Sequence, residues 1–367
     1  MADYKAAVPV TPETPFCIAS VNKSMTVAVA VGLLEEGKIA LGDSLERFFP
    51  GFPRGGRITF EHVLRHRAGF PHRVTEPEEE ATPLTSAEMV ERVRAHVAEE
   101  GFLCEPGEES NYSSAGYSLA ARMCELASGE DFGALLARFV YEPAGMTHSF
   151  HPAPDLVIPP RARSYLNQWP GVRDAPDKHY SFLVGAGSVF STARDLSRFL
   201  HAIVDTVYSP LVLASLMKEK GLENNGITNG YRAFADYHKD GDLYVVFTGN
   251  RHTGATDRMR KDIPRIAAGE DVPVPERIVV EQVPLAEEVL HRFEGSWVSE
   301  TGSDFDITAE DGQLMAGGWA LIPTSETTFF SPQDYADVEF ELEEGRPVRL
   351  LWETGGDPLV WTRVEEE

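Results

Sequence analysis

Apolar residues cover nearly every face of the segment from Ser20 to Glu36, which reads SVNKSMTVAVAVGLLEE. A helix that is apolar all round lies buried in the centre of a domain, and Gly37 is a residue type that ends helices. Ser86 is placed to cap another helix. Amphipathic patterns predict helices over residues 61–70, 86–101, 115–128, 131–140 and 191–204, with one more near Arg258.

Strand patterns are confined to the second half of the chain. The runs YRAFADYH (231–238) and LYVVFTGN (243–250) meet across a polar turn and predict an antiparallel hairpin. Beyond a proline-containing stretch, short runs of alternating residues predict a small barrel or sandwich, with hairpin turns at Asp311–Gly312 and Glu344–Gly345. We therefore predict an α+β chain with three parts: a mixed domain over 1–268, a linker over 269–284 and an all-β barrel over 285–367.

The charge of the chain is strongly negative and unevenly distributed. The 367 residues carry a net charge of −25, and residues 269–367 hold 24 acidic and 5 basic residues, so −19 of that charge lies there. An acidic surface repels nucleic acids and anionic membranes. A content of 42% hydrophobic residues excludes a fully disordered chain, and no apolar run is long enough for a membrane-spanning helix.

Cysteine and histidine patterns predict neither a disulfide framework nor a metal site. Three cysteines are too few and too widely spaced for such a framework. His62 and His66 have the spacing of metal ligands on a helix, but no glutamate lies between them and no third ligand is evident. The N-terminus lacks the features of a signal peptide, so we expect a cytoplasmic protein without a cofactor, unless coding sequence upstream of Met1 supplies a leader.

Ser20-Val21-Asn22-Lys23 is a Ser-x-x-Lys motif at the start of the predicted buried helix. Residues three apart share a helix face, so the hydroxyl and the amine can meet. Serine needs a base to become a nucleophile, and burial favours the neutral amine that can act as one. On spacing alone, a capping serine and a solvent-directed lysine explain the motif better than a catalytic pair does. The same spacing recurs at Ser215–Lys218, which opens no long buried helix.

The surrounding segments resemble the serine β-lactamase-related family, which includes class C β-lactamases, penicillin-binding D-peptidases and related esterases. The resemblance covers roughly residues 4–268, with the similar segments in the family's order. They are TPETPFCIASVNKSMT, GLLEEGKIALGDSLERFFP, EHVLRHRAGFP, PGEESNYSSAGYSLAARMCELASG, YEPAGMTHSF and GAGSVFSTARDLSRFL. The resemblance implies that Ser20 is the acyl-accepting nucleophile, that Lys23 is its partner, and that the backbone N–H of Ser20 is one oxyanion donor.

The family's catalytic tyrosine corresponds to Tyr112, which the resemblance implies relays the proton, with its phenolate favoured by the nearby lysine. Tyr165-Leu166-Asn167 has a similar form, but it lacks the preceding Pro-Gly and the following Gly-Tyr that surround Tyr112. Ser114 stands where the family often has asparagine, so one amide donor to the substrate is lost.

The third motif of the family departs further from the usual pattern. The family has lysine or histidine, any residue and glycine, whereas this chain has Asn224, Asn225 and Gly226, followed by Ile227. These four residues are expected to line the substrate site. Asparagine carries no positive charge, which weakens recognition of a carboxylate. His252-Thr253-Gly254 is a second candidate for the motif, but it follows the last strand of the hairpin instead of preceding the hairpin.

The predicted sheet is smaller than the family's. Only 19 residues precede Ser20, where the family has two strands and often a helix, and a strand before the third motif is expected to be absent. Missing strands would expose a sheet edge through which two copies of the chain could pair. The tail resembles the lipocalin-like barrel that follows the catalytic domain in some family members. Its aromatic residues fit either the core of that barrel or a ligand cavity.

The sequence and its resemblance to the family lead to two hypotheses for the function, an enzyme and a binding protein. In the first, the chain is a serine hydrolase that acts through an acyl-enzyme on small esters or D-peptide amides, with Ser20, Lys23 and Tyr112 as catalytic residues. In the second, it is a catalytically impaired relative that binds a ligand or partner, which the residues Ser114 and Asn224 and the missing strands favour. Hydrolysis of β-lactams is the less expected activity, because the second and third motifs are weakened.

Overall fold

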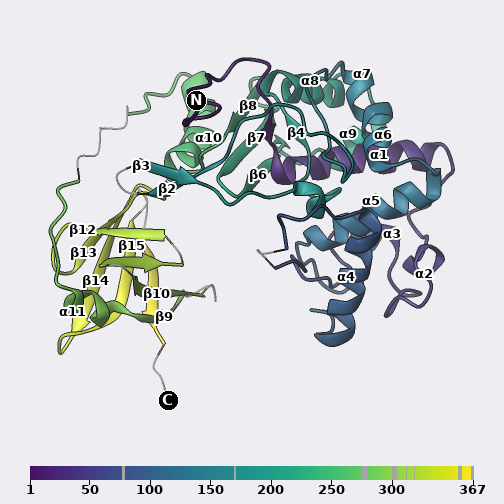
Figure 1. Ribbon diagram of the computed structural model, residues 1–367. Coiled ribbons are helices and arrows are strands. Elements are labelled where there is room, and N and C mark those ends of the chain that lie inside the picture. The colour runs from purple at the N-terminus through teal and green to yellow at the C-terminus, as the bar shows by residue number, and fades with distance from the viewer. Residues whose placement is uncertain are drawn as a thin grey trace. The chain divides into compact units, whose positions relative to one another are not determined.

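We describe the protein from a computed structural model (Figure 1). The structure describes residues 1–76, 79–168, 171–273, 280–299, 304–310, 312–317, 319–353 and 358–364. Part of the predicted linker (274–279) and Asp311 of one predicted turn lie outside these residues. By contacts, the chain divides into two compact units: unit 1 is Met1–Ser164 with Ala175–Asn250, and unit 2 is Tyr165–Asp174 with Arg251–Glu367.

Unit 1 is a helical body joined to a small antiparallel sheet. Its helices are α1 (Asn22–Glu35), α2 (Leu45–Phe48), α3 (Phe60–Leu64), α4 (Ser86–Glu99), α5 (Ser114–Ser128), α6 (Phe132–Leu136), α7 (Glu142–Ala144), α8 (Ala193–Val204) and α9 (Pro210–Leu216), with the short turns η1 (Ala19–Val21), η2 (Ala137–Tyr141) and η3 (Tyr180–Leu183). Its strands are β1 (Phe16–Cys17), β4 (Phe190–Ser191), β5 (Gly221–Leu222), β6 (Asn225–Thr228), β7 (Tyr231–His238) and β8 (Leu243–Gly249).

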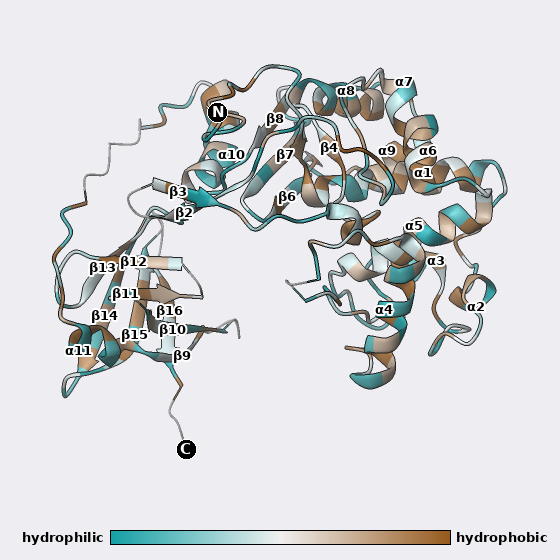
Figure 2. Cartoon of the chain, in the orientation of Figure 1, coloured by the Kyte–Doolittle hydropathy of each residue, from teal (hydrophilic) through white to brown (hydrophobic). Residues whose placement is uncertain are grey.

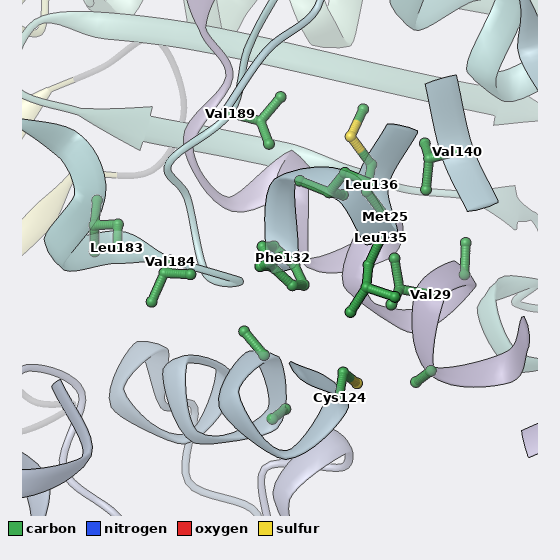
Figure 3. Close-up of a cluster of buried hydrophobic side chains, with 14 of the residues drawn as sticks. Met25, Val29, Cys124, Phe132, Leu135, Leu136, Val140, Leu183, Val184 and Val189 are labelled. Carbon is green, nitrogen blue, oxygen red and sulfur yellow. The ribbon is translucent and has the colours of Figure 1, made fainter. Parts of the chain in front are cut away.

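Helix α1 is the centre of unit 1, as its all-round apolar pattern predicts. Ten of its fourteen residues are buried. Met25 and Val29 of α1 pack with Cys124 of α5 and with Phe132 and Leu135 of α6 (Figure 3). The polar residues at the start of α1 are therefore held inside the domain by the burial of the rest of the helix.

Helices α4, α5 and α8 lie within about two residues of their predicted extents. The helix predicted over 61–70 is shorter than expected, since α3 ends at Leu64, and the helix predicted over 131–140 is divided into α6 and the π-helical η2. One helix start also needs a correction. Helix α4 shows both hydrophobic and hydrophilic residues in Figure 2, and Val90, Val93 and Val97 are buried on one side of it. Ser86 is not its cap. Thr85 accepts the backbone N–H of Glu88, and the Glu88 carboxylate accepts that of Thr85. This reciprocal pair satisfies two free donors of the first turn, which a lone serine one residue later could not do.

The sheet of unit 1 is built around β7. Strands β7 and β8 form the predicted hairpin, with Phe234 opposite Phe247, and β6 pairs along the other edge of β7. A strand does precede the third motif, contrary to our prediction, but it is only the two-residue β5, which pairs with the end of β7. Within residues 1–19, the only strand is β1, and it pairs with β4. Among the described residues, the sheet built around β7 thus consists of the four strands β5 to β8.

Unit 2 contains a closed antiparallel barrel. The strands of the barrel are β9 (Gly295–Ser299), β10 (Asp304–Glu310), β11 (Gln313–Ala316), β12 (Trp319–Pro323), β13 (Thr328–Ser331), β14 (Ala336–Glu343), β15 (Arg346–Glu353) and β16 (Leu359–Arg363). The other elements of unit 2 are the two-stranded sheet of β2 (Tyr165–Gln168) and β3 (Gly171–Asp174), the helices α10 (Gly254–Ala267) and α11 (Glu287–Leu290), and the short turn η4 (His291–Phe293). Strands β10 to β16 follow one another around the barrel and β9 closes it. The predicted α+β chain with a C-terminal all-β barrel is confirmed.

Aromatic side chains fill the interior of the barrel. Trp297 and Phe329 are fully buried, and the ring of Phe340 lies 5.5 Å from each of them. The ring of Phe293 lies 4.5 Å from Phe340 and 5.3 Å from Phe329. The predicted Glu344–Gly345 turn joins β14 to β15, and both of its residues have positive φ angles, 49° and 81°. That geometry matches the twist of a two-residue hairpin. Among the described residues, no helix combines the length and hydrophobicity needed to cross a bilayer.

Candidate active site

Ser20 lies in the turn η1, directly before the buried helix α1. The chain enters this turn through Ala19, whose φ angle is 45°. A left-handed conformation costs a non-glycine residue about 1–2 kcal/mol, and such strain persists only where the surrounding packing enforces it. The side chain of Ser20 is half-buried, so its hydroxyl borders both the protein interior and solvent.

Lys23 lies one turn further along and is almost completely buried, with 7% of its surface exposed. Its Nζ lies 3.2 Å from the Ser20 Oγ and 3.2 Å from the Ser114 Oγ, and it donates a hydrogen bond of 2.8 Å to the carbonyl oxygen of Ala186. Burial lowers the pKa of Lys23 to about 7, and the positive charge of Arg73 contributes to the lowering. Near neutral pH, Lys23 is therefore available as a base for the Ser20 proton.

Tyr112 completes the group from the loop that leads into α5. Its hydroxyl donates to the Ser20 Oγ over 2.8 Å, while half of the side chain (49%) remains exposed. The expected phenolate is wrong: burial raises the pKa of Tyr112, and only the hydrogen bond with Ser20 opposes that rise. The Nζ of Lys23 lies 4.8 Å from the centre of the tyrosine ring. Near neutral pH the Tyr112 hydroxyl therefore keeps its proton, whereas a large share of the Lys23 amine is neutral.

Two histidines that the sequence reasoning did not place at the site pack against Tyr112. The ring of His66 lies 4.6 Å from the ring of Tyr112, and its Nδ1 accepts the backbone N–H of Ser113 over 3.1 Å. The ring of His72 lies 5.3 Å from Tyr112. Burial lowers the pKa of His66 to about 4 and also lowers that of His72, so both rings are neutral at pH 7. They orient the tyrosine without adding charge.

His62, which shares the metal-ligand spacing with His66 in the sequence, has a local structural role. The Nδ1 of His62 accepts the backbone N–H of Thr59 at the start of α3, 3.4 Å away. Within the part of the chain that the structure describes, no three histidine, cysteine or acidic side chains gather as metal ligands.

Asn224 is turned into the protein. Its amide nitrogen donates to the Ala235 carbonyl over 2.8 Å, its amide oxygen accepts the hydroxyl of Ser24, and its backbone N–H donates to Asp236. With 8% of its surface exposed, the residue fastens the third motif to α1. Asn224 thus supplies no charge to the site, and both ends of its amide are occupied within the protein.

Strand β6 runs beside the backbone of Ser20. A Cβ built on Gly226 would collide with the Ile18 carbonyl and lie 3.1 Å from the Ser20 nitrogen, so glycine permits this close approach. Asn225 and Ile227 alternate with Gly226 and are exposed. The backbone of β6 is therefore in place to provide a second donor beside the Ser20 N–H, which is the arrangement an oxyanion requires.

The two alternative motifs lie elsewhere in the chain. Tyr165 begins strand β2 in unit 2 and is buried. His252 is also in unit 2, where its Nε2 lies 2.9 Å from Asp257 of α10. The structure therefore brings Ser20, Lys23, Tyr112 and Ser114 together with β6, and it leaves Tyr165 and His252 outside this group.

A family model described as Beta-lactamase matches residues 1–268. The chain belongs to the beta-lactamase family. A serine next to a buried lysine and a tyrosine, on this fold, makes it a β-lactamase-related serine hydrolase by family and architecture.

Known proteins similar to this beta-lactamase family member include penicillin-binding protein 4* of Bacillus subtilis, which is 24% identical over 95% of this chain and 88% of its own length. The D-alanyl-D-alanine-carboxypeptidase/endopeptidase AmpH of Escherichia coli is 26% identical over 50% of this chain and 47% of its own. The crystal structure of D-amino acid amidase from Ochrobactrum anthropi aligns with a TM-score of 0.64 and 20% identity, covering 73% of this chain and 89% of the amidase. This structural likeness supports the fold.

Proposed function

We propose that the chain hydrolyses small esters or amides of D-amino acids and D-peptides through an acyl-enzyme on Ser20. The observation that carries the proposal is the hydrogen-bonded position of the Ser20 Oγ, between the Nζ of Lys23 at 3.2 Å and the hydroxyl of Tyr112 at 2.8 Å. A nucleophile within reach of both a base and a proton donor is the arrangement that acyl transfer needs.

In the acylation step, the neutral amine of Lys23 takes the proton of Ser20 as the Oγ bonds to the substrate carbonyl carbon. The carbonyl oxygen becomes an oxyanion, which the N–H of Ser20 and the backbone of β6 are placed to stabilise. As the bond to the leaving group breaks, Tyr112 gives its proton to the departing oxygen or nitrogen and recovers one from the Lys23 ammonium. Water then attacks the acyl-enzyme and loses a proton to Lys23. As the bond between the acyl group and the Ser20 Oγ breaks, the Lys23 ammonium returns that proton to the Oγ, and the acid is released.

The substrate class is supported by the names of the relatives and by the openness of the site. A D-amino acid amidase, a D-alanyl-D-alanine-carboxypeptidase/endopeptidase and a penicillin-binding protein are among the similar proteins. Tyr112 is half-exposed, so a small acyl compound reaches Ser20 from solvent without a deep channel. Esters are the most reactive members of this class and are therefore the first substrates to test.

Asn224 favours the alternative of a catalytically impaired binding protein. Its amide is occupied by Ser24 and by the Ala235 carbonyl, so the third motif brings no cation to the substrate or to the Tyr112 proton. A site with this defect can bind an acyl compound and yet turn it over slowly.

A fluorophosphonate probe with an intact-mass readout separates the two functions. We expect one label per chain in the unmodified protein and none in Ser20→Ala, with turnover of p-nitrophenyl acetate lost in the same variant. Ser215→Ala is the matched control, because it alters the second Ser-x-x-Lys sequence, and it should label normally. Absence of label on folded protein, shown by an unchanged circular dichroism spectrum, would rule out the hydrolase in favour of the binding protein.

A further inference from the structure

The segment 185–189 lies against the turn η1 and the start of helix α1, and it is hydrogen-bonded to them along its whole length. Each of its residues has a partner between residues 17 and 26. The pairs are the Gly185 carbonyl with the Thr26 hydroxyl (2.6 Å), the Ala186 carbonyl with the Lys23 Nζ (2.8 Å), the Gly187 carbonyl with the Cys17 thiol (3.4 Å), the Ser188 N–H with the Asn22 Oδ1 (3.2 Å) and the Val189 carbonyl with the Ile18 N–H (3.0 Å). The position of this segment therefore decides where the first turn of α1, and with it Lys23, is held.

Glycines let the segment come this close. A Cβ built on Gly187 would lie 3.3 Å from the carbonyl carbon of Ala19, and a Cβ built on Gly185 would collide with the Tyr117 carbonyl of α5. The segment thus lies between α5 and the residue in left-handed conformation that precedes Ser20. Such strain persists only where the surroundings enforce it, and this segment is part of those surroundings.

The Ala186 carbonyl orients the amine of Lys23. Three groups lie within hydrogen-bond distance of the Nζ: this carbonyl and the hydroxyls of Ser20 and Ser114. A neutral amine has two N–H donors and one lone pair. A carbonyl can only accept, whereas either hydroxyl can donate to the lone pair. While the carbonyl holds one N–H, the lone pair is left for a hydroxyl, and the amine can take the Ser20 proton.

His151, in the loop that follows α7, is hydrogen-bonded to the same segment. Its Nδ1 lies 2.8 Å from the Ser188 Oγ, which donates to the Asn22 Oδ1 over 3.4 Å. Ser188 and Asn22 are fully buried. Because an amide oxygen only accepts, the Ser188 proton points to Asn22, and the ring nitrogen of His151 donates to Ser188. Burial lowers the pKa of His151 to about 4, so the ring is neutral at pH 7 with its proton on Nδ1.

We propose that His151 is a positioning residue for Lys23. Through Ser188 and Asn22 it fixes the segment 185–189 on α1, and so it keeps the Ala186 carbonyl on the Lys23 amine. The inference rests on the proposed function, since it assigns how the base of that site is held. Displacement of a reacting group by about 1 Å can reduce a rate about a hundredfold, so a residue that acts only through others can have a large effect.

Substitutions of His151 and Ser188 test the proposal in the p-nitrophenyl acetate assay at pH 7.4. His151→Leu removes the ring donor and should lower kcat about tenfold or more, with KM unchanged within about twofold, because no substrate contact is lost. His151→Asn keeps a donor at the δ position and should recover at least about half of kcat. Ser188→Ala should act like His151→Leu, and the double variant should be no slower than either single variant, because both break the same network.

His179→Leu is the matched control. The Nδ1 of His179 lies 2.9 Å from the Ser181 hydroxyl, and that hydroxyl accepts the backbone N–H of Leu84 instead of bonding to α1. The control thus breaks a histidine–serine pair of the same kind without loosening the segment, and kcat should stay within about twofold. Thermal melting shows that each variant is folded, and fluorophosphonate labelling counts the active sites to which kcat refers.

The pKa of Lys23 gives a second readout that does not depend on turnover. It is measured from the pH dependence of the ¹³Cε chemical shift in protein labelled with ¹³C-lysine, and Lys23→Met assigns the signal. Burial lowers this pKa to about 7. A loosened segment admits water to the amine, so His151→Leu should raise the pKa by at least about half a unit, and His179→Leu should not change it. The other titratable and charged groups that face Lys23 are left in place by all these variants: Arg73, His66, His72, Tyr112 and Tyr117.

A folded His151→Leu or Ser188→Ala protein with an unchanged kcat and an unchanged Lys23 pKa would overturn the proposal. Equal losses in His179→Leu would also overturn it, and so would a raised KM with an unchanged kcat, which would indicate a substrate contact. Failure of the proposed function is read separately: the unmodified protein would then neither label nor turn over substrate, and the Lys23 pKa would still decide whether His151 holds the amine.

Discussion

Replacing Lys23 by methionine tests whether a buried amine is the base of the site. Burial and the charge of Arg73 lower the pKa of Lys23 to about 7. At pH 7.4, such an amine is deprotonated in roughly 70% of molecules, whereas a lysine with an ordinary pKa is deprotonated in roughly one molecule in a thousand. The tertiary environment thus raises the fraction of active base by roughly three orders of magnitude.

The assay is the rate of fluorophosphonate labelling, or kcat/KM for p-nitrophenyl acetate, between pH 5.5 and 9. The rate should fall about tenfold per pH unit below pH 7 and level off above it, because only the neutral amine accepts the Ser20 proton. His66 and His72 do not produce this limb, since burial places the pKa of both below the ordinary histidine value. Lys23→Met should lose the limb and most of the rate. A profile that is flat from pH 5.5 to 8 in the unmodified protein would refute the reasoning.

The same pKa shift predicts a pH dependence of stability. Between pH 7 and 10.5, unfolded Lys23 holds a proton that folded Lys23 has released. The unfolded state therefore binds more protons, and the free energy of unfolding gains about 1 kcal/mol per pH unit from this group as pH rises through that interval. The difference between the unmodified protein and Lys23→Met, from urea unfolding at pH 7.5 to 9.5, should show this slope. A difference that does not vary with pH would mean that Lys23 keeps an ordinary pKa in the fold.

Three further substitutions test the geometry around Ser20. Tyr112→Phe should reduce kcat at least a hundredfold in the p-nitrophenyl acetate assay, because it removes the hydroxyl that donates to Ser20, while Tyr165→Phe should keep most activity; equal losses would mean that the wrong tyrosine was chosen. Gly226→Ala should abolish labelling, because a Cβ there meets the Ile18 and Ser20 backbone, whereas Gly42→Ala, which meets nothing within 4 Å, should label normally. Asn224→Ala should lower the free energy of unfolding in urea by about 2 kcal/mol, since it leaves buried partners unsatisfied; an unchanged urea midpoint would contradict the inward orientation of this amide.

Local patterns in the sequence determined most of the helices and strands and the pairing of Ser20 with Lys23, whereas the choice of Ser20 as nucleophile came from the resemblance of the surrounding segments to the family. The all-round apolar run after Ser20 predicts the buried helix, because a helix with no polar face has nowhere else to lie. The Ser-x-x-Lys spacing brings Ser20 and Lys23 together, since residues three apart share a face in any helix. Alternation and turn residues predict the β7–β8 hairpin and the Glu344–Gly345 turn. All of these depend on neighbours within about ten residues.

Only the tertiary structure decided the chemistry of the site. Tyr112, 92 positions from Ser20, meets it because α5 packs on α1. The inward turn of Asn224 depends on Ser24, 200 positions away, and the lowered pKa of Lys23 depends on burial by several elements. Such contacts join parts of the chain that are distant in sequence, and a pKa reflects every group packed around the atom. No local pattern encodes them, because they arise when separate elements exclude water from the same place.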